Sequence, residues 1–327
     1  MKKILAMLLA VMMLLSVASV AMADEINTDQ QTVTIKKVYK LANAGTKSPA
    51  ETFNLTQTGS RVVDGEATSA PDLGTITGAT FAEGAATVNG ATGDITVTLP
   101  EYTHVGVYEY TLKETAATTA GVTYYGDDIT LKVTVINDTE GNLRIAAVHA
   151  ESANNAPEEG ETKKDNFPNT YSAGKLNVTK TVAGNLGDKD KKFDFSVTFK
   201  KPEGKTVKST IAATVAGQNV TFTPAWNENG EYTYTFQLAH DETATFDNLP
   251  YGVTYTVTET AVSDYETTKT GDTGTINKAD QTAAFTNTKI GEIDMGVMLD
   301  SMPYVLVLAV VGAAVIALIA KKRRAED

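Results

Sequence analysis

The stretch LNVTKTV, residues 176–182, alternates apolar and polar residues as a half-buried β-strand does, and then places a lysine on the apolar side. Successive side chains of a strand point to opposite faces, so Lys180 shares its face with the hydrophobic residues that precede it. A second stretch, VTIKKVY at 33–39, repeats the pattern with Lys37. Two strands that each turn a lysine toward the core require a chemical reason.

Short alternating runs rich in Thr, Val and Tyr recur along most of the chain. Turn-forming groups separate them, such as NG at 89–90, DTEG at 138–141 and NENG at 227–230. This pattern is typical of an all-β protein, and a sandwich of two sheets is favoured over a closed barrel. The segment YSAG at 171–174 lies between two strand signals, so we place a domain boundary there.

The two halves contain the same three polar residues in the same order. Each half begins with a lysine strand, continues to a Tyr-x-hydrophobe-x-Glu-Thr strand and ends in Phe-x-Asn. By parity, each polar side chain shares a face with the hydrophobic residues of its strand, so all are expected to point inward. The residues are Lys37, Glu114 and Asn169 in the first half, and Lys180, Glu259 and Asn287 in the second.

These residue types suggest a covalent crosslink. Burying an unpaired charge is so costly that the lysine is expected to lose its proton and the glutamate to keep one. A neutral lysine is a nucleophile that can attack the asparagine carboxamide, displace ammonia and form an amide. The protonated glutamate would hydrogen-bond the asparagine carbonyl oxygen and pass a proton to the leaving nitrogen.

We therefore predict one self-generated isopeptide bond per domain, formed once per molecule and without enzymatic turnover. The alternative is that the lysines reach solvent at sheet edges, the glutamates lie on the surface and Phe-x-Asn merely begins a turn. One triplet alone would favour that alternative. Two triplets with the same order and matching parity favour the crosslinks.

The two ends of the chain indicate export. Residues 1–23 combine a basic start, an apolar run and Ala-Met-Ala, which is typical of a secretory signal peptide cleaved after Ala23. Residues 304–320 are apolar and are followed by four basic residues, which indicates a transmembrane helix with a cytoplasmic tail rather than a buried core helix. The predicted segments are 1–23, an N-terminal domain over 24–172, a C-terminal domain over 173–290, and a sorting and membrane segment over 291–327.

The composition excludes several classes of function. The chain has 28 basic and 40 acidic side chains, and its net charge of -12 disfavours nucleic acid as a partner. Because it has no cysteine, an exported protein of this kind lacks disulfides, and any covalent reinforcement must use other chemistry. His104, His149 and His240 lack metal-ligand spacing, and no phosphate-binding or nucleophile-elbow motif occurs, so no metal or cofactor is expected.

On these residues and motifs, the chain resembles the major (backbone) pilins of Gram-positive bacteria, which contain isopeptide bonds in immunoglobulin-like CnaB-type domains. The resemblance covers the chain after the signal peptide, including the C-terminal sorting signal. It implies two tandem immunoglobulin-like β-sandwich domains, with bonds from Lys37 to Asn169 and from Lys180 to Asn287 assisted by Glu114 and Glu259. It also implies a secreted structural subunit of a covalent pilus at the cell wall.

The resemblance further implies assembly by a pilin-type sortase, which cleaves a pentapeptide before the membrane segment. The matching pentapeptide begins at Glu292, with cleavage between Met295 and Gly296, and it departs from the family pattern in having methionine where threonine is usual. Lys163 or Lys164 matches the position of the lysine that accepts the next subunit. The implied partners are other copies of the chain, head to tail, and peptidoglycan or a base pilin, with membrane contact only before sorting.

Two other classes of function stay open at this point. One is a monomeric wall-anchored adhesin that binds a host or microbial ligand, with the crosslinked domains as its stalk. The other is a secreted enzyme, which would need a polar cleft that no motif in the sequence supports. A ladder of covalent multiples in detergent-boiled wall extracts would distinguish the pilus subunit from the adhesin.

Overall fold

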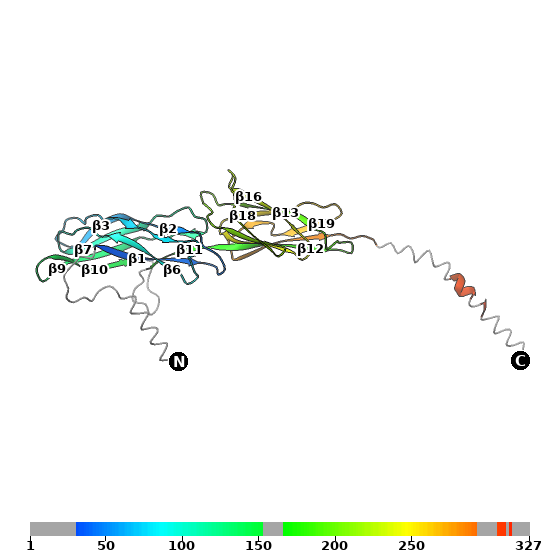
Figure 1. Cartoon of the computed structure of the whole chain (residues 1–327), viewed down its shortest axis with the longest axis horizontal. Helices are drawn as coiled ribbons and strands as arrows, with labels where there is room; N and C mark the ends of the chain where they lie inside the picture. Colours follow the sequence, from blue (N-terminus) through cyan, green and yellow to red (C-terminus); the bar gives the residue numbers. More distant parts are fainter. Residues whose placement is uncertain (1–30, 153–165, 293–305, 312–313, 316–327) are drawn as a thin grey trace, which may run out of the picture.

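The computed structural model describes residues 31–152, 166–292, 306–311 and 314–315. They form two β domains that lie end to end along the long axis of the molecule (Figure 1). The strands of the first domain are β1 (Thr32–Leu41), β2 (Glu51–Phe53), β3 (Leu55–Gly65), β4 (Ile76–Thr77), β5 (Ala79–Phe81), β6 (Ala91–Thr98), β7 (Gly106–Glu114), β8 (Val122–Thr123), β9 (Ile129–Asn137), β10 (Leu143–Glu151) and β11 (Asn166–Tyr171). The strands of the second domain are β12 (Ala173–Ala183), β13 (Phe193–Lys200), β14 (Ile211–Val215), β15 (Gln218–Phe222), β16 (Glu231–Leu238), β17 (Thr243–Pro250), β18 (Thr254–Glu259), β19 (Glu266–Thr270), β20 (Thr273–Thr275) and β21 (Asp280–Thr288). The prediction of a mainly β protein with two β domains is confirmed.

The predicted helical ends are described only in part. Helical residues occur at 306–311 and 314–315, within the run predicted to cross the membrane. Among the residues that the structure describes, no helix has the length and apolar character needed to span a bilayer. The signal peptide over 1–23 and most of 304–320 lie outside the described residues, so both stay predictions.

The first domain consists mainly of two sheets around one core. One sheet has the strand order β4-β6-β1-β11-β8, the other has β10-β9-β7-β3, and β2 pairs with β5 beside them. Alternate residues of the strands face inward, as Ile35 and Ile95 do from the first sheet and Tyr110 and Leu131 do from the second. β1 is a central strand that pairs antiparallel with β6 and parallel with β11, the last strand of the domain.

The second domain repeats this arrangement around a separate core. Its sheets have the orders β15-β14-β17-β12-β21-β19 and β16-β13-β18-β20. Leu176 and Phe285 face the core from one sheet, and Val197 and Val257 face it from the other. The first strand, β12, again pairs antiparallel on one side, with β17, and parallel on the other side, with the last strand, β21. In each domain the first and last strands are therefore direct neighbours.

Turns form at the groups that the sequence indicated. The hairpin between β9 and β10 turns at Asp138–Gly141, where the Asp138 carboxylate accepts hydrogen bonds from the backbone N–H groups of Glu140 and Asn142. Gly141 has φ of 87°, a left-handed conformation that glycine adopts without steric cost. The Asn227–Gly230 turn before β16 ends in the same way, with φ of 72° at Gly230.

Only Ser172 separates β11 from β12, and polar contacts connect the two domains around it. Asn43 Nδ2 donates to Tyr251 Oη at 2.8 Å. Lys208 Nζ lies 3.1 Å from a carboxylate oxygen of Glu51, whose side chain is 4% exposed. The second domain is thus held against the first by side chains as well as by the chain itself.

Candidate functional site

Three polar side chains meet in the core of the first domain. Lys37 lies on β1 and Asn169 on β11, and the parallel pairing sets Lys37 opposite Phe167 and Tyr39 opposite Asn169. Glu114 ends β7 in the facing sheet. The side chains of Lys37, Glu114 and Asn169 are buried. The fold therefore brings together the three residues that parity had assigned to the interior.

Each member of this first triad contacts the other two. Lys37 Nζ donates to Glu114 Oε2 and, at 2.7 Å, to Asn169 Oδ1. Asn169 Nδ2 donates to Glu114 Oε1 at 2.5 Å. The backbone N–H of Tyr125 also donates to Asn169 Oδ1, at 2.9 Å. An amine thus lies beside a carboxamide, with a carboxylate in contact with both nitrogens.

The surroundings of Lys37 favour its reactive form. Its Nζ lies 5.3 Å from the ring centroid of Phe53 and 5.6 Å from that of Tyr125. Burial lowers the pKa of Lys37 to about 8, and the charge and hydrogen bond of Glu114, which favour the ammonium form, limit the fall. Near neutral pH a larger share of this lysine is therefore the neutral amine, the form that attacks a carbonyl carbon.

A second triad occupies the same place in the second domain. Lys180 on β12 and Asn287 on β21 follow the register of the first domain, with Lys180 opposite Phe285 and Val182 opposite Asn287. Glu259 ends β18 in the facing sheet. Lys180 is 1% exposed, Asn287 is 0% exposed and the Glu259 side chain is 3% exposed. All six residues of the two predicted triads are therefore placed inside the cores.

The contacts within the second triad differ from those in the first. Lys180 Nζ donates to both carboxylate oxygens of Glu259, at 2.9 and 3.0 Å. Asn287 Nδ2 donates to Glu259 Oε1, whereas Asn287 Oδ1 has no hydrogen-bond partner among the residues described. Lys180 Nζ lies 4.1 Å from the ring centroid of Phe193. Burial lowers the pKa of Lys180, and the hydrogen bond and charge of Glu259 oppose that shift.

The glutamates are hydrogen-bonded to a different atom of the asparagine from the carbonyl oxygen that we expected. Both Glu114 and Glu259 accept a hydrogen bond from the carboxamide nitrogen, and in the described ranges neither is hydrogen-bonded to the carbonyl oxygen. A carboxyl group in this place can deliver a proton to the leaving nitrogen, but it does not polarise the carbonyl. In the first domain the carbonyl oxygen is instead contacted by Lys37 and by the backbone of Tyr125. Sequence reasoning missed Tyr125 because a backbone donor has no residue-type signature.

The other predicted functional residues lie outside the described part of the chain. Lys163 and Lys164 fall in the segment 153–165, and Met295 and Gly296 fall in 293–305. Their assignment to polymerisation and to sortase cleavage stays a prediction. Described strands border the first of these segments, since β10 ends at Glu151 and β11 begins at Asn166.

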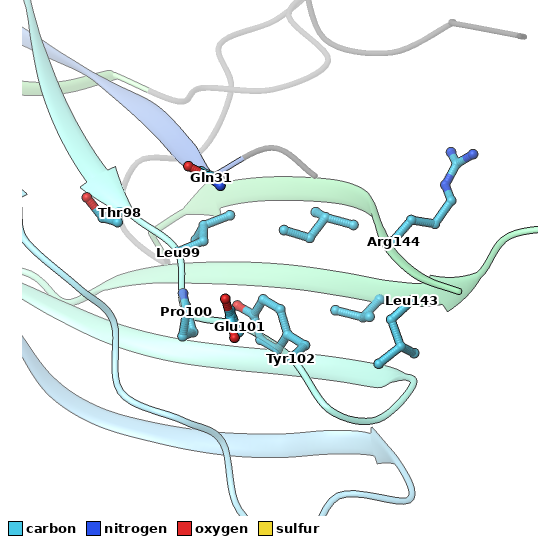
Figure 2. Close-up of a pocket in the computed structure, with 10 residues that line it drawn as sticks. Gln31, Thr98, Leu99, Pro100, Glu101, Tyr102, Leu143 and Arg144 are labelled. Carbon is cyan, nitrogen blue, oxygen red and sulfur yellow. The ribbon is translucent and has the colours of Figure 1, made fainter. Parts of the chain in front are cut away.

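Two features outside the triads concern possible binding sites in the described ranges. No group of three or more His, Asp and Glu side chains there could hold a metal ion. A groove of about 430 Å³ lies between the Leu99–Tyr102 segment and residues 143–145 of β10. Figure 2 shows Tyr102 directed into this groove and the Arg144 side chain extending away from it. The groove has no residue in common with either triad.

Comparison with protein families divides the chain in two. Residues 33–172 match the family described as "Spy0128-like isopeptide containing domain". Residues 174–289 match a family described as "Domain of unknown function (DUF7601)". The first match covers all three residues of the first triad, and the second covers all three of the second.

Two curated relatives come from Streptococcus pyogenes. A protein described as "Pilin", from serotype M1, is 29% identical in an alignment 234 positions long, which covers 64% of this chain and 66% of that protein. A "Pilus tip adhesin Cpa" is 34% identical in an alignment 122 positions long, which covers 35% of this chain and 17% of that protein. The matched parts thus span slightly under two thirds of the pilin and about a sixth of the adhesin.

Solved structures from the same species have a similar fold. The crystal structure of a major pilin from Streptococcus pyogenes matches with a TM-score of 0.51 and 23% identity, over 81% of this chain and 100% of that one. The major pilin T3.2 of the same species matches with a TM-score of 0.50 and 18% identity, over 80% and 99%. At these identities the likeness supports the two-domain fold alone.

Proposed function

We propose that the chain is a structural subunit of a covalent pilus on a Gram-positive cell surface, and the match of residues 33–172 to the Spy0128-like isopeptide-containing domain family supports this proposal. In this proposal each domain makes one isopeptide bond, from Lys37 to Asn169 and from Lys180 to Asn287. The observation that carries it is the pair of buried triads, in each of which a glutamate contacts a lysine amine and an asparagine carboxamide.

The geometry supports one reaction class, intramolecular amide exchange. The neutral lysine Nζ attacks the asparagine side-chain carbonyl carbon, and the glutamate transfers a proton from Nζ to the leaving nitrogen. One ammonia departs for each bond, and no cofactor is consumed. Because the reacting groups are held in contact by packed strands, effective molarity replaces turnover catalysis. The protein is its own substrate and reacts once per domain.

The position of the bonds fits a load-bearing shaft. In each domain the proposed amide joins the first strand to the last, and these strands are parallel neighbours. A force that enters at one end of a domain and leaves at the other would pass through the crosslink. The hydrogen-bond ladders of the sheets would then bear little of that force, and the domain would not extend.

For assembly, we propose secretion through the signal peptide over 1–23 and temporary anchoring through 304–320. A pilin-type sortase would cleave after Met295 and transfer the new carbonyl to Lys163 or Lys164 of the next subunit. The last subunit would be joined to peptidoglycan or to a base pilin. We propose CnaB-type immunoglobulin-like domains over 24–172 and 173–290, which would form the repeating unit of the fibre.

One experiment tests the crosslinks directly. Tryptic digestion of the folded chain is expected to release two branched peptides, one that joins Lys37 to Asn169 and one that joins Lys180 to Asn287. Glu114→Ala is expected to remove only the first peptide, and Glu259→Ala only the second. If both peptides persist in their respective variants, the glutamates have no part in the reaction. If neither peptide occurs in the unchanged chain, the proposal fails.

A wall-anchored adhesin is the second candidate, favoured by the alignment of 122 positions with a pilus tip adhesin. Both candidates use the crosslinked domains, but only the pilus subunit forms covalent polymers of itself. Wall extracts boiled in detergent and probed with an antibody to the chain separate the two. A ladder of multiples supports the pilus subunit, whereas a single band supports the adhesin.

A further inference from the structure

We propose that the backbone N–H of Tyr125 is an oxyanion donor for the crosslink of the first domain, and that the bond between Lys180 and Asn287 forms more slowly because its site lacks such a donor. The inference rests on the isopeptide chemistry proposed above. It adds a catalytic group to that chemistry, and it predicts that the bond of the first domain forms before the bond of the second.

The Tyr125 N–H has the geometry that an oxyanion donor needs. When Lys37 attacks the Asn169 carboxamide, negative charge develops on Oδ1, and donors about 2.7–3.1 Å from the position that this oxyanion takes stabilise the transition state. The Tyr125 nitrogen lies 2.9 Å from Oδ1, with a longer contact of 3.4 Å to Glu114 Oε1. A backbone group held in a folded domain needs little reorganisation as the charge develops.

The end of a strand ladder makes this N–H available. β8 is only two residues long and pairs with β11 at Val122 and Thr123. After Thr123 the strand ends, so the backbone of Tyr125 is not part of the ladder. Its N–H instead donates to the side chain of Asn169, one residue before the β11 residues that β8 pairs with.

The second domain has a continuous ladder at the equivalent place. β19 pairs with β21 from Glu266 to Thr270, with Thr267 directly opposite Asn287. The neighbouring backbone is therefore part of a regular strand, and Asn287 Oδ1 is buried without a hydrogen-bond partner in the described ranges. Lys180 Nζ also makes both of its hydrogen bonds to Glu259. The carboxamide of this triad is thus less polarised than that of Asn169.

The chemical balance is the same in both domains. The lysine Nζ to asparagine Cγ bond forms, the Cγ–Nδ2 bond breaks, and the proton from Nζ reaches Nδ2 through the glutamate. Ammonia leaves, and no oxidant, reductant or co-reactant is needed. The two sites therefore differ in the stabilisation of the oxyanion and not in the overall reaction.

Isotope pulse-labelling of the full chain in expressing cells measures the two rates in the same molecules. Samples are quenched in acid denaturant at successive times and digested with trypsin, and the two branched peptides are quantified. The Lys37–Asn169 peptide is expected to accumulate at least about tenfold faster, because an oxyanion donor contributes about 10²–10³ in rate. Equal rates, or faster formation of the Lys180–Asn287 peptide, would overturn the inference.

A pair of substitutions at one position isolates the N–H. Tyr125→Pro removes the donor and the side chain, whereas Tyr125→Ala removes the side chain and keeps the donor. Relative to Tyr125→Ala, the proline variant is expected to slow the Lys37–Asn169 bond by at least about tenfold. The Lys180–Asn287 bond in the same molecules is the internal reference and is expected to keep its rate. Equal rates of the first bond in the two variants would refute the role of the N–H.

The possible failures are distinguishable from one another. If the first domain of the proline variant does not fold, as judged by its digestion under native conditions, the comparison of the two bonds in the unchanged chain decides. If neither branched peptide forms in the unchanged chain, the proposed function fails, and this inference fails with it. If both peptides form but the expected order or the effect of proline is absent, only the oxyanion role is lost.

Discussion

The double substitution Lys37→Met with Glu114→Gln is expected to lower the free energy of unfolding of the first domain. The size of the loss depends on the number of residues that the crosslink encloses. Removal of the lysine prevents the crosslink. The simultaneous change of Glu114 avoids a buried carboxylate without a partner, which would add several kcal/mol of its own. Methionine keeps the length and apolar stem of the lysine, and glutamine keeps a carbonyl oxygen that can accept from Asn169 Nδ2.

The magnitude follows from the span of the bond. Lys37 and Asn169 are 132 residues apart in sequence. The chain-entropy relation for a crosslink of this loop length gives about 5 kcal/mol at 25 °C. For a domain of this size, that loss lowers the midpoint of thermal unfolding by about 15 °C.

The assay is differential scanning calorimetry of the full chain beside mass spectrometry of the same sample. Lys36→Met is the matched control, because Lys36 lies next to Lys37 but pairs with Asp94 at the surface, where both side chains are more than half exposed. That change is expected to cost less than about 1 kcal/mol. A double variant that lacks the crosslink and yet unfolds within about 3 °C of the unchanged chain would refute the loop-entropy argument.

Three further predictions concern pH, force and assembly. In Asn169→Ala, Lys37 cannot form the crosslink and stays a free lysine. In the folded state its pKa is about 8, whereas in the unfolded state it keeps its proton up to its ordinary pKa of 10.5, so between these values the unfolded state binds more protons. The free energy of unfolding measured in urea should therefore rise by up to about 3 kcal/mol from pH 8 to 10.5. The unchanged chain, with Lys37 converted to an amide, should lack this slope, and the same slope in both proteins would contradict the prediction. In single-molecule pulling, Asn287→Ala should release about 107 residues, roughly 35 nm of extended chain, where the unchanged second domain releases none of that loop. One of the two single variants Lys163→Arg and Lys164→Arg should abolish the polymer ladder in wall extracts, and the other should keep it. A ladder in both variants would show that neither lysine alone is the linking residue.

Strand periodicity was enough to predict that the two triad lysines lie inside. A period of two assigned Lys37 and Lys180 to the apolar faces, where the structure has them. By the same period Lys36 must point the opposite way, and its side chain is exposed in the structure. The same periodicity does not say which strands are neighbours, because a face is a local property and pairing is not. The predicted crosslinks already required the first and last strands of each domain to lie close together, but the parallel pairing of β1 with β11 and of β12 with β21, and its register, became visible only in the fold.

The details of the triads were harder to predict for a related reason. The carboxamide of Asn169 has an oxygen and a nitrogen on one carbon, and residue type alone does not say which of them a glutamate meets. The donor of Tyr125 depends on where a two-residue strand ends, which no side-chain pattern marks. The contact of Glu51 with Lys208 joins residues from different domains and likewise has no signal in either local sequence.

The most direct test of the account is the intact mass of the folded chain after removal of the signal peptide. The account predicts a mass about 34 Da below the encoded formula, the loss of one ammonia for each of the two bonds. It also predicts that Lys37→Met and Lys180→Met each restore half of the deficit. A mass that equals the encoded formula would contradict it, because two buried amines would then lie beside two intact carboxamides.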